Sequence, residues 1–285
     1  MPKLSMILAV MIAFLLPAVG LAEPLETEKI IIPEDDIESL QIEGDFGVGY
    51  FEITTADMKE IARGDIEYAP RQVEIFSEYD RHGEKGYLRL GSEYRRSRDI
   101  DTDDNHWSLT LSTRYVTELV ADFGACEASL DLGGLPLEYL EFDIGAADAE
   151  LTFGSPNPTV IDRIDIDAGA ASFRADKLGN ARFRRLYFDG GVGKFELSFD
   201  GDFREKATAH IDIGLGSAVI RIPADLPVRL DAPSSFLSSV EFEDDGGGEF
   251  DDDGFYESGD FRSSETGLEL IISVGLGTVE IIRGE

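Results

Sequence analysis

One short glycine motif recurs along this chain, and the pattern of apolar residues changes phase at every copy. Four copies read Gly-x-Gly and three end in alanine or cysteine; the first glycines are Gly47, Gly124, Gly145, Gly169, Gly191, Gly214 and Gly275. Around Gly145, the apolar residues Phe142 and Ile144 stand at even-numbered positions before the glycine, whereas Ala149 and Leu151 stand at odd-numbered positions after it. Side chains alternate between the two faces of a strand, so this slip indicates a bend that lets both halves face one core. Glycine suits such a bend because it tolerates unusual backbone angles and close backbone approach.

The spacing of the motif predicts how the bent strands are arranged. From Gly124 to Gly214 the first glycines follow one another at steps of 21, 24, 22 and 23 residues. Such a period is typical of solenoids, in which each unit buries its apolar side only against its neighbours. We therefore predict an all-β fold: a single-stranded β-helix or solenoid-like rack of short strands with Gly-x-Gly corners, plus a β-rich N-terminal region. A phosphate-binding loop is disfavoured because a strand-like run, not a helix, follows Gly193.

The first 22 of the 285 residues have the pattern of a secretory signal peptide. Lys3 precedes a long apolar run that Pro17 interrupts, and the small residues Gly20 and Ala22 suit cleavage. The alternative is a retained membrane anchor, although the apolar run before Pro17 is short for a membrane span. We expect an exported chain with no transmembrane segment after cleavage, located in the periplasm, at the cell surface or outside the cell.

The net charge limits the classes of possible partner, and the cysteine content indicates what stabilises the fold. Asp and Glu number 58 against 25 Lys and Arg, which gives a formal net charge of −33. This excess disfavours nucleic acid and anionic lipid as partners, and it fits a solvated exterior or the binding of divalent cations. The single cysteine, Cys126, cannot form an intramolecular disulfide, so the apolar core must hold the exported fold together. Cys126 stands at the third position of a motif copy, where a small buried residue is expected.

Composition divides the chain beyond the signal peptide into two regions. Residues 23–115 are the expected β-rich N-terminal capping region, with an acidic lead-in and a short helical turn at 55–63. Residues 116–285 are the expected repeat region. Within it, residues 232–266 interrupt the rhythm with an acidic run rich in glycine and serine that nevertheless contains six aromatic residues. So many aromatics argue against disorder, and we expect a long loop or irregular strand pair packed on the end of the rack.

Residues that could carry catalysis are few. The chain has three histidines, His82, His106 and His210, and none is spaced from a serine or from Cys126 as a known nucleophile motif requires. A Ser-His-Asp set could still assemble in space. Carboxylates are so common in this chain that no particular pair is informative. We predict no enzymatic activity, no catalytic residues and no bound cofactor.

Calcium is the one ligand that the composition suggests, because hard cations bind clustered carboxylate and carbonyl oxygens. Residues 101–105 begin like an EF-hand loop, but His106 and Ser112 occupy the positions that need glycine and glutamate. A looser set of calcium candidates consists of Asp251, Asp252, Asp253, Glu257 and Asp260. A solvated acidic loop is the favoured interpretation of this set, and a calcium site is the alternative.

Two clusters of arginines stand out in so acidic a chain, at residues 95–98 and 182–185. Either cluster could bind an anionic polymer or an acidic neighbour. The favoured interpretation is that these arginines balance Asp and Glu side chains on the exposed faces of neighbouring strands.

The motif copies and their flanks also resemble a known family. The stretch LDLGGLPLEYLEFDIGAADAELTF at residues 130–153 is similar to toastrack-type domains of adhesin-like or cell-wall-active-antibiotics-response proteins. Residues 61–93 resemble the toastrack-associated domain that precedes the rack, and residues 179–201, 210–223 and 270–282 resemble its successive rungs. The resemblance implies an envelope-associated β-solenoid without known catalysis, whose relatives are membrane-linked partners in envelope stress signalling. This chain differs from those relatives in having a signal peptide and no transmembrane helices beyond it.

These patterns predict an exported, non-enzymatic binding or structural module of the bacterial cell envelope, either adhesin-like or related to envelope stress. Its partner would be an envelope protein or polysaccharide. Two alternatives stay open. One is a calcium-stabilised surface adhesin, and the other is a carbohydrate-active enzyme of the envelope, because β-solenoids can carry carboxylate clusters on their faces.

Overall fold

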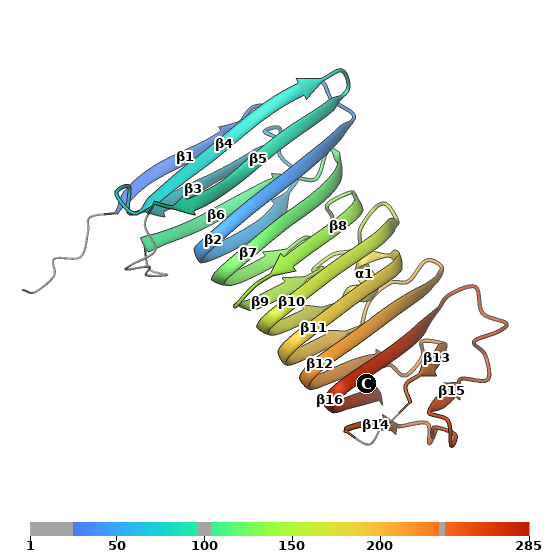
Figure 1. The fold of residues 1–285 in the computed structure, drawn as a ribbon. Helices are drawn as coiled ribbons and strands as arrows, with labels where there is room; N and C mark the ends of the chain where they lie inside the picture. The colour runs from blue at the N-terminus through green and yellow to red at the C-terminus, as the bar shows by residue number, and fades with distance from the viewer. Residues whose placement is uncertain (1–24, 96–103, 234–236, 285) are drawn as a thin grey trace, which may run out of the picture.

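The computed structural model describes residues 25–95, 104–233 and 237–284, and the expected signal peptide lies outside them. Within these ranges the chain consists of sixteen β-strands and one short helix, α1 (Leu178–Ala181), so the predicted all-β class is confirmed. Figure 1 shows the strands as a stack of rungs that runs from the N-terminal strands at one end to the C-terminal strands at the other.

The stack is built from rungs that each contain one copy of the glycine motif. Six rungs in the described chain are long single strands: β2 (Ser39–Ala56), β7 (Val116–Asp131), β10 (Ile161–Asp176), β11 (Phe183–Ser198), β12 (Lys206–Pro223) and β16 (Gly267–Gly284). One further rung, between β7 and β10, is divided into β8 (Leu137–Ile144) and β9 (Asp148–Thr152). Neighbouring rungs pair in parallel. Most rungs are thus longer than the predicted short strands, because all of them bend at the same place and the hydrogen-bond ladder continues past the bend.

The bend folds each rung into two layers that enclose one core. In β10, Ile164 and Ile166 are buried before the motif, and Phe173 and Ala175 are buried after it, so the alternation changes phase as the sequence predicted. We call the halves before the motif the first layer and the halves after it the second layer. Side chains from the two layers meet inside the stack, as in β11, where the ring centroids of Phe188 and Phe195 lie 5.3 Å apart.

Glycine is required at the bend because the backbones of neighbouring rungs approach closely there. A Cβ atom added to Gly191 or Gly214 would lie 2.6 Å from the carbonyl oxygen of the first glycine in the preceding rung. At the third position of the motif, Gly216 and Gly277 also have φ angles of 146° and 144°, which side chains disfavour. The motif is therefore a structural corner, as its sequence context indicated.

Five further strands extend both layers at the N-terminal end, which is drawn in blue and cyan-green in Figure 1: β1 (Glu26–Ile32), β3 (Ala62–Tyr68), β4 (Val73–His82), β5 (Lys85–Tyr94) and β6 (Asn105–Ser112). β5 pairs in parallel with the first half of β2, and β6 pairs in parallel with its second half. β4 continues the first layer in antiparallel pairing with β5, and β3 and β1 continue the second layer in the same way.

Two local predictions for this end need correction. The acidic lead-in contains a strand, β1, because its Ile30 and Ile32 are buried in the core. The helical turn at 55–63 does not form, since β2 continues to Ala56 and the N–H group of Ile61 donates to the carbonyl oxygen of Ile32 at 2.9 Å. This hydrogen bond and the burial of Ile61 thus hold the segment against β1, and the hydrogen bonds of a helical turn are not formed.

Three short strands extend the layers past the last rung: β13 (Val228–Asp231), β14 (Ser238–Asp244) and β15 (Phe255–Glu257). β13 pairs with the first half of β16 and β14 with its second half, both in parallel, and β15 pairs with β13 in antiparallel orientation. The ring of Phe242 lies 5.0 Å from that of Phe250 and 4.9 Å from that of Tyr256, measured between centroids. Phe242, Phe250 and Tyr256 of the acidic segment thus pack against the end of the core.

Candidate functional site

A groove of about 570 Å³ opens on the outer face of the second layer, near the N-terminal end. Five neighbouring strands form its floor, in the order β3, β6, β2, β7 and β9. Alternate residues of these strands, such as Phe51 and Trp107, are buried in the core. The outward-pointing residues between them therefore line the groove.

The pairing register arranges the outward residues in two rows across the strands. The row nearer the bend reads Glu67, His106, Tyr50, Glu127 and Asp148 from β3 to β9. The second row, two residues away on each strand, reads Asp65, Ser108, Glu52, Ser129 and Glu150. The two rows contain six carboxylates and no lysine or arginine, and we call this surface the acidic groove.

The negative charge of the acidic groove is mostly uncompensated. Among the described residues, Asp65 is the one groove carboxylate with a cationic partner, Lys29 at 3.6 Å, and both side chains are exposed. On the next strand, Arg174 stands in register with Glu150, but its guanidinium binds Glu196 at 3.0 Å instead. The groove therefore attracts cations and repels anions.

Two aromatic side chains lie side by side in the middle of the acidic groove. The ring centroids of Tyr50 and His106 are 4.8 Å apart, with their planes inclined by 42°. The Nε2 atom of His106 is buried and has no hydrogen-bond partner in the described part of the chain. An unpaired buried polar atom costs roughly 1–3 kcal/mol, so stability alone does not explain this arrangement. The faces of aromatic rings attract cations, so the pair offers a surface that favours a cationic group.

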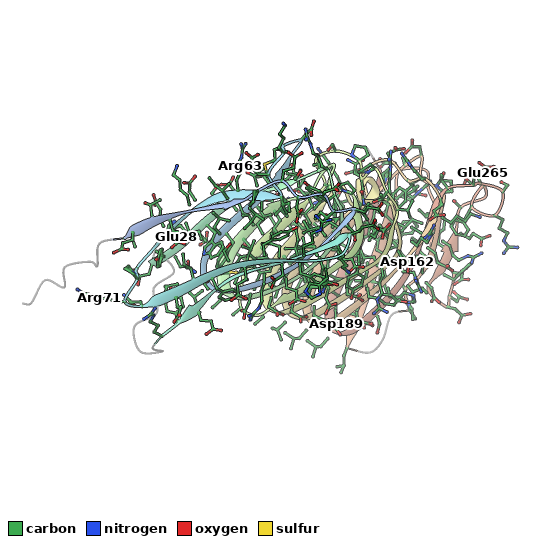
Figure 2. The ribbon with its side chains drawn as sticks, turned by 90° about the horizontal axis from the view of Figure 1, so that it is seen from above. Glu28, Arg63, Arg71, Asp162, Asp189 and Glu265 are labelled. Carbon is green, nitrogen blue, oxygen red and sulfur yellow. The ribbon has the colours of Figure 1, made fainter. Side chains whose placement is uncertain are left out.

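A second acidic feature, which we call the aspartate column, runs along the first layer beside the bend. Six successive rungs present an aspartate two residues before the first glycine, and these residues pair in register: Asp45, Asp122, Asp143, Asp167, Asp189 and Asp212. Figure 2 shows charged side chains along the whole outside of the stack, from Glu28 near one end to Glu265 near the other, with Asp189 among them.

Neighbouring carboxyl groups perturb each other within the aspartate column. Burial, a hydrogen bond with Asp143 and the charge of Asp143 raise the pKa of Asp122 above its ordinary value. Burial and the charges of Asp143 and Asp189 likewise raise the pKa of Asp167. Because protonation relieves the repulsion, Asp122 and Asp167 hold protons more tightly than isolated aspartates do.

The five calcium candidates make separate contacts in the structure. Glu257 forms ion pairs with Arg229 at 2.8 Å and Arg262 at 2.6 Å, and the hydrogen bond from Arg229 holds its pKa below the ordinary value. The carboxylate of Asp251 accepts the N–H groups of Asp253 and Phe255 and so closes a turn.

The remaining candidates do not join these two. Asp260 accepts a hydrogen bond from the Ser258 hydroxyl at 2.8 Å, while Asp252 and Asp253 are exposed. Within residues 25–95, 104–233 and 237–284, no group of three or more His, Cys, Asp or Glu residues is arranged to hold a metal ion. Calcium binding by this loop stays the alternative to a solvated acidic loop.

The arginine clusters pair with local acids where the structure describes them. Arg184 and Arg185 both contact Asp162, at 3.5 and 2.6 Å, and Arg95 lies 3.4 Å from Glu74. The buried Arg182 binds Asp202 and donates to the carbonyl oxygen of Asn157. Arg96 and Arg98 lie outside the described residues. Arg95, Arg184 and Arg185 thus balance neighbouring acids as expected, whereas Arg182 is buried at the end of α1 and does not lie on an exposed strand face.

The described chain places no histidine in a nucleophile–base pair. His82 and His210 contact tyrosine rings, and His106 contacts Tyr50 in the acidic groove. Cys126 is buried, and burial raises the pKa of its thiol to about 12, which keeps it protonated and unreactive. In the described ranges, no helix is long and apolar enough to span a membrane.

His106 is the one groove residue that the sequence patterns singled out, and it was considered there only as a possible base. A signal for others exists in the motif copies, because Tyr50, Glu127 and Asp148 each stand three residues after a first glycine. The aspartate column likewise appears when the copies are aligned on that glycine. Glu67 and His106 cannot be found this way, since β3 and β6 are inserted between two rungs and contain no motif copy.

Solved structures show distant likenesses over almost the whole chain. A provisionally named cell adhesion protein from Clostridium sporogenes ATCC 15579 is 19% identical, with a TM-score of 0.46, over 91% of this chain and 99% of that chain. A provisionally named adhesin from Bacteroides fragilis NCTC 9343 is 11% identical, with a TM-score of 0.41, over 91% and 98% of the two chains. A provisionally named lipid binding protein from Parabacteroides distasonis ATCC 8503 is 9% identical, with a TM-score of 0.37, over 90% and 96%. Similarities this low carry no argument about function.

A search of curated proteins finds no match. A family model described as the N-terminal domain of toast_rack, DUF2154, matches residues 22–174, which is more than half of the chain. The matched region includes every residue of the acidic groove. The resemblance drawn from the motif copies is thereby confirmed, and the chain belongs to the toast_rack N-terminal domain family.

Proposed function

We propose that this chain is an exported, non-enzymatic binding module of the bacterial cell envelope, adhesin-like in role, and that the acidic groove is its binding surface. In this proposal the stacked rungs act as a solenoid-like rack that holds the groove in a fixed shape. Export is supported by the signal-peptide pattern of residues 1–22. The partner is an envelope protein or polysaccharide that carries positive charge.

The observation that carries the proposal is the concentration of unpaired carboxylates in the acidic groove. Glu52, Glu127 and Asp148 have no ion-pair partner among the described residues, and they flank the aromatic pair of Tyr50 and His106. Like charges on adjacent strands destabilise a sheet. A local arrangement that costs stability without an internal compensation is typical of a functional surface.

The shape of the groove favours binding over catalysis. It is an open sheet face rather than an enclosed pocket, and such a surface suits a long chain or another surface better than a small substrate. The groove contains a histidine and two serines, but no hydrogen bond joins them in the described chain, so they form no nucleophile–base pair there. These features support a binding module.

A pair of charge-matched variants tests the proposal. The groove variant combines Glu52→Gln, Glu127→Gln and Asp148→Asn. The control variant combines Glu241→Gln, Glu243→Gln and Glu280→Gln, which remove the same charge from the other end of the second layer. We expect the groove variant to bind envelopes of the source cells at least about tenfold more weakly than the unmodified chain, and the control to stay within about twofold.

Other results would contradict the proposal. Equal binding by the unmodified chain and the groove variant would exclude the acidic groove as the binding surface. Binding that disappears with a calcium chelator would favour a calcium-stabilised adhesin instead. Release of sugar from the envelope by the unmodified chain, but not by the groove variant, would favour a carbohydrate-active enzyme.

A further inference from the structure

We infer that the acidic groove binds an extended polypeptide segment that carries lysine or arginine side chains at regular intervals. The inference rests on the proposed function, because it names the ligand class of the same surface. Three properties of the groove lead to it: the sign of its charge, the spacing of its carboxylates and the position of its aromatic pair.

The sign and dispersal of the charge favour organic cations. The groove has six carboxylates and no cationic side chain in its lining, so it repels anionic polymers. These carboxylates are spread over four of the five strands, and no group of three or more is arranged for a metal ion in the described chain. Separate cationic side chains can each reach one carboxylate, whereas a single metal ion needs several ligands at once.

The second row sets the spacing of the cations. Across the strands it reads acid, serine, acid, serine, acid, in the residues Asp65, Ser108, Glu52, Ser129 and Glu150. Neighbouring strands lie about 4.8 Å apart, so the carboxylates recur about every 10 Å. A polyproline II chain advances about 9 Å per three-residue turn. A segment laid across the strands with a cation at every third residue would therefore meet all three carboxylates.

The floor of the groove limits the binding mode to side-chain contacts. Every strand of the floor is paired on both sides, so no free edge is available for a peptide to join the sheet as a further strand. Ser108 and Ser129 offer hydroxyl groups to the peptide backbone between the charged positions. The ring of Tyr50, half-buried beside His106, offers a face to one cation of the ligand.

A fluorescent peptide tests the inference directly. The probe has about twelve residues, with lysine at every third position and proline, serine or glycine elsewhere, and a second probe has glutamine in place of each lysine. Binding of each probe to the purified protein is measured by fluorescence anisotropy at low salt. We expect the lysine probe to bind and the glutamine probe not to bind. Added salt should weaken the complex, because its contacts are ionic.

The variants locate the site of binding. The groove variant should weaken binding of the lysine probe at least about tenfold, and the control variant should change it by less than about twofold. Tyr50→Ala should weaken it about threefold, as expected for the loss of one exposed cation–π contact. Thermal unfolding of each variant checks that the fold is retained, and the neutral replacements remove like-charge repulsion rather than packing.

Several outcomes would overturn the inference. Equal weakening by the groove and control variants would show attraction to the net charge of the chain instead of a site. Binding of a glucosamine oligomer, but not of the lysine probe, would identify a cationic polysaccharide as the ligand. Loss of envelope binding in the groove variant, without binding of the lysine probe, would overturn this inference and leave the proposed function standing.

Discussion

At the scale of single residues, the fold depends on glycines whose missing side chains make room for the next rung. Gly216 combines a φ angle of 146° with a position at which an added Cβ atom would overlap the carbonyl oxygen of Gly193. We expect Gly216→Ala to lower the free energy of unfolding by about 3 kcal/mol or more, since strain and overlap act together. Urea denaturation of the purified variant measures this loss.

Gly259 provides the control for this prediction. It has no atom within 4 Å of an added Cβ and no left-handed φ angle, so Gly259→Ala should change the free energy of unfolding by less than about 0.5 kcal/mol. Equal losses at the two positions would contradict the role given to the corner glycines.

The aspartate column gives a prediction about pH. Asp143 stands between Asp122 and Asp167 in register, and it raises the pKa of both. A carboxyl whose pKa is raised in the folded state adds stability at low pH, and this stability is lost as the pH rises through the raised pKa. At pH 7 the charged column is therefore destabilising.

We expect Asp143→Asn to increase the free energy of unfolding at pH 7 by roughly 0.2–1 kcal/mol, the range for like charges on adjacent strands. The gain should shrink as the pH falls through the raised pKa of Asp122 and Asp167, and it should be gone below the ordinary carboxyl pKa, where the aspartates are protonated. Denaturation curves at several pH values measure it, with Asp225→Asn as a control at an acid that has no ion pair within the described residues. A loss of stability at pH 7 would mean that a counter-ion holds the column together.

At the scale of elements, sequence patterns predicted the rungs well and the N-terminal end poorly. The phase slip located the bend in every motif copy, because a period-two pattern reports which side of a strand is buried. It did not reveal β1, whose Ile30 and Ile32 alternate over too short a run, nor the strand ends at Ala56 and Ala62 that replace the expected helical turn. At those positions the choice depends on contacts with distant strands.

The combination of residues that forms the acidic groove could not be predicted, for a related reason. Asp65 and Glu52 are brought together only by the order of pairing, in which β6 lies between β3 and the second half of β2. No local pattern specifies that β6, from an inserted segment, joins this layer. The outward positions of single rungs could be predicted from the motif copies, but their combination across five strands could not.

One buried ion pair joins β14, beyond the last rung, to β16. Arg283 of β16 lies in register with Asp244 of β14, their charged atoms are 3.1 Å apart, and their side chains are 11% and 2% exposed. Burial opposes ionisation of Asp244, but the N–H groups of Gly246 and Gly248 together with Arg283 outweigh it and lower its pKa. A lowered pKa adds stability above the ordinary carboxyl pKa, and this stability is lost as the pH falls.

We expect Asp244→Asn to lower the free energy of unfolding at neutral pH by about 3–5 kcal/mol, because it leaves a buried guanidinium without its counter-charge. The difference from the unmodified chain should narrow in acid. Glu243→Gln, at the adjacent exposed position, is the control and should change stability by less than about 0.5 kcal/mol. Denaturation at neutral and acidic pH measures both variants, and equal small effects would show that this ion pair does not hold the end of the stack.

At the scale of the whole molecule, the two ends of the stack have different roles. The N-terminal end widens both layers with added strands and contains the acidic groove, whereas the C-terminal end covers the core with the short strands after β12. The rungs between them set the distance from one end to the other (Figure 1). A net charge of −33 keeps such a chain apart from anionic surfaces and directs it toward cationic partners.

The most direct measurement is photo-crosslinking from defined positions on intact cells of the source. A photoreactive amino acid at Ser129 reports on the acidic groove, and the same residue at Thr208 reports on the outer face of the first layer. We expect a discrete crosslinked partner from Ser129 and none from Thr208, with or without a calcium chelator. A partner captured from Thr208 alone, or one lost from Ser129 on chelation, would contradict the assignment of binding to the acidic groove.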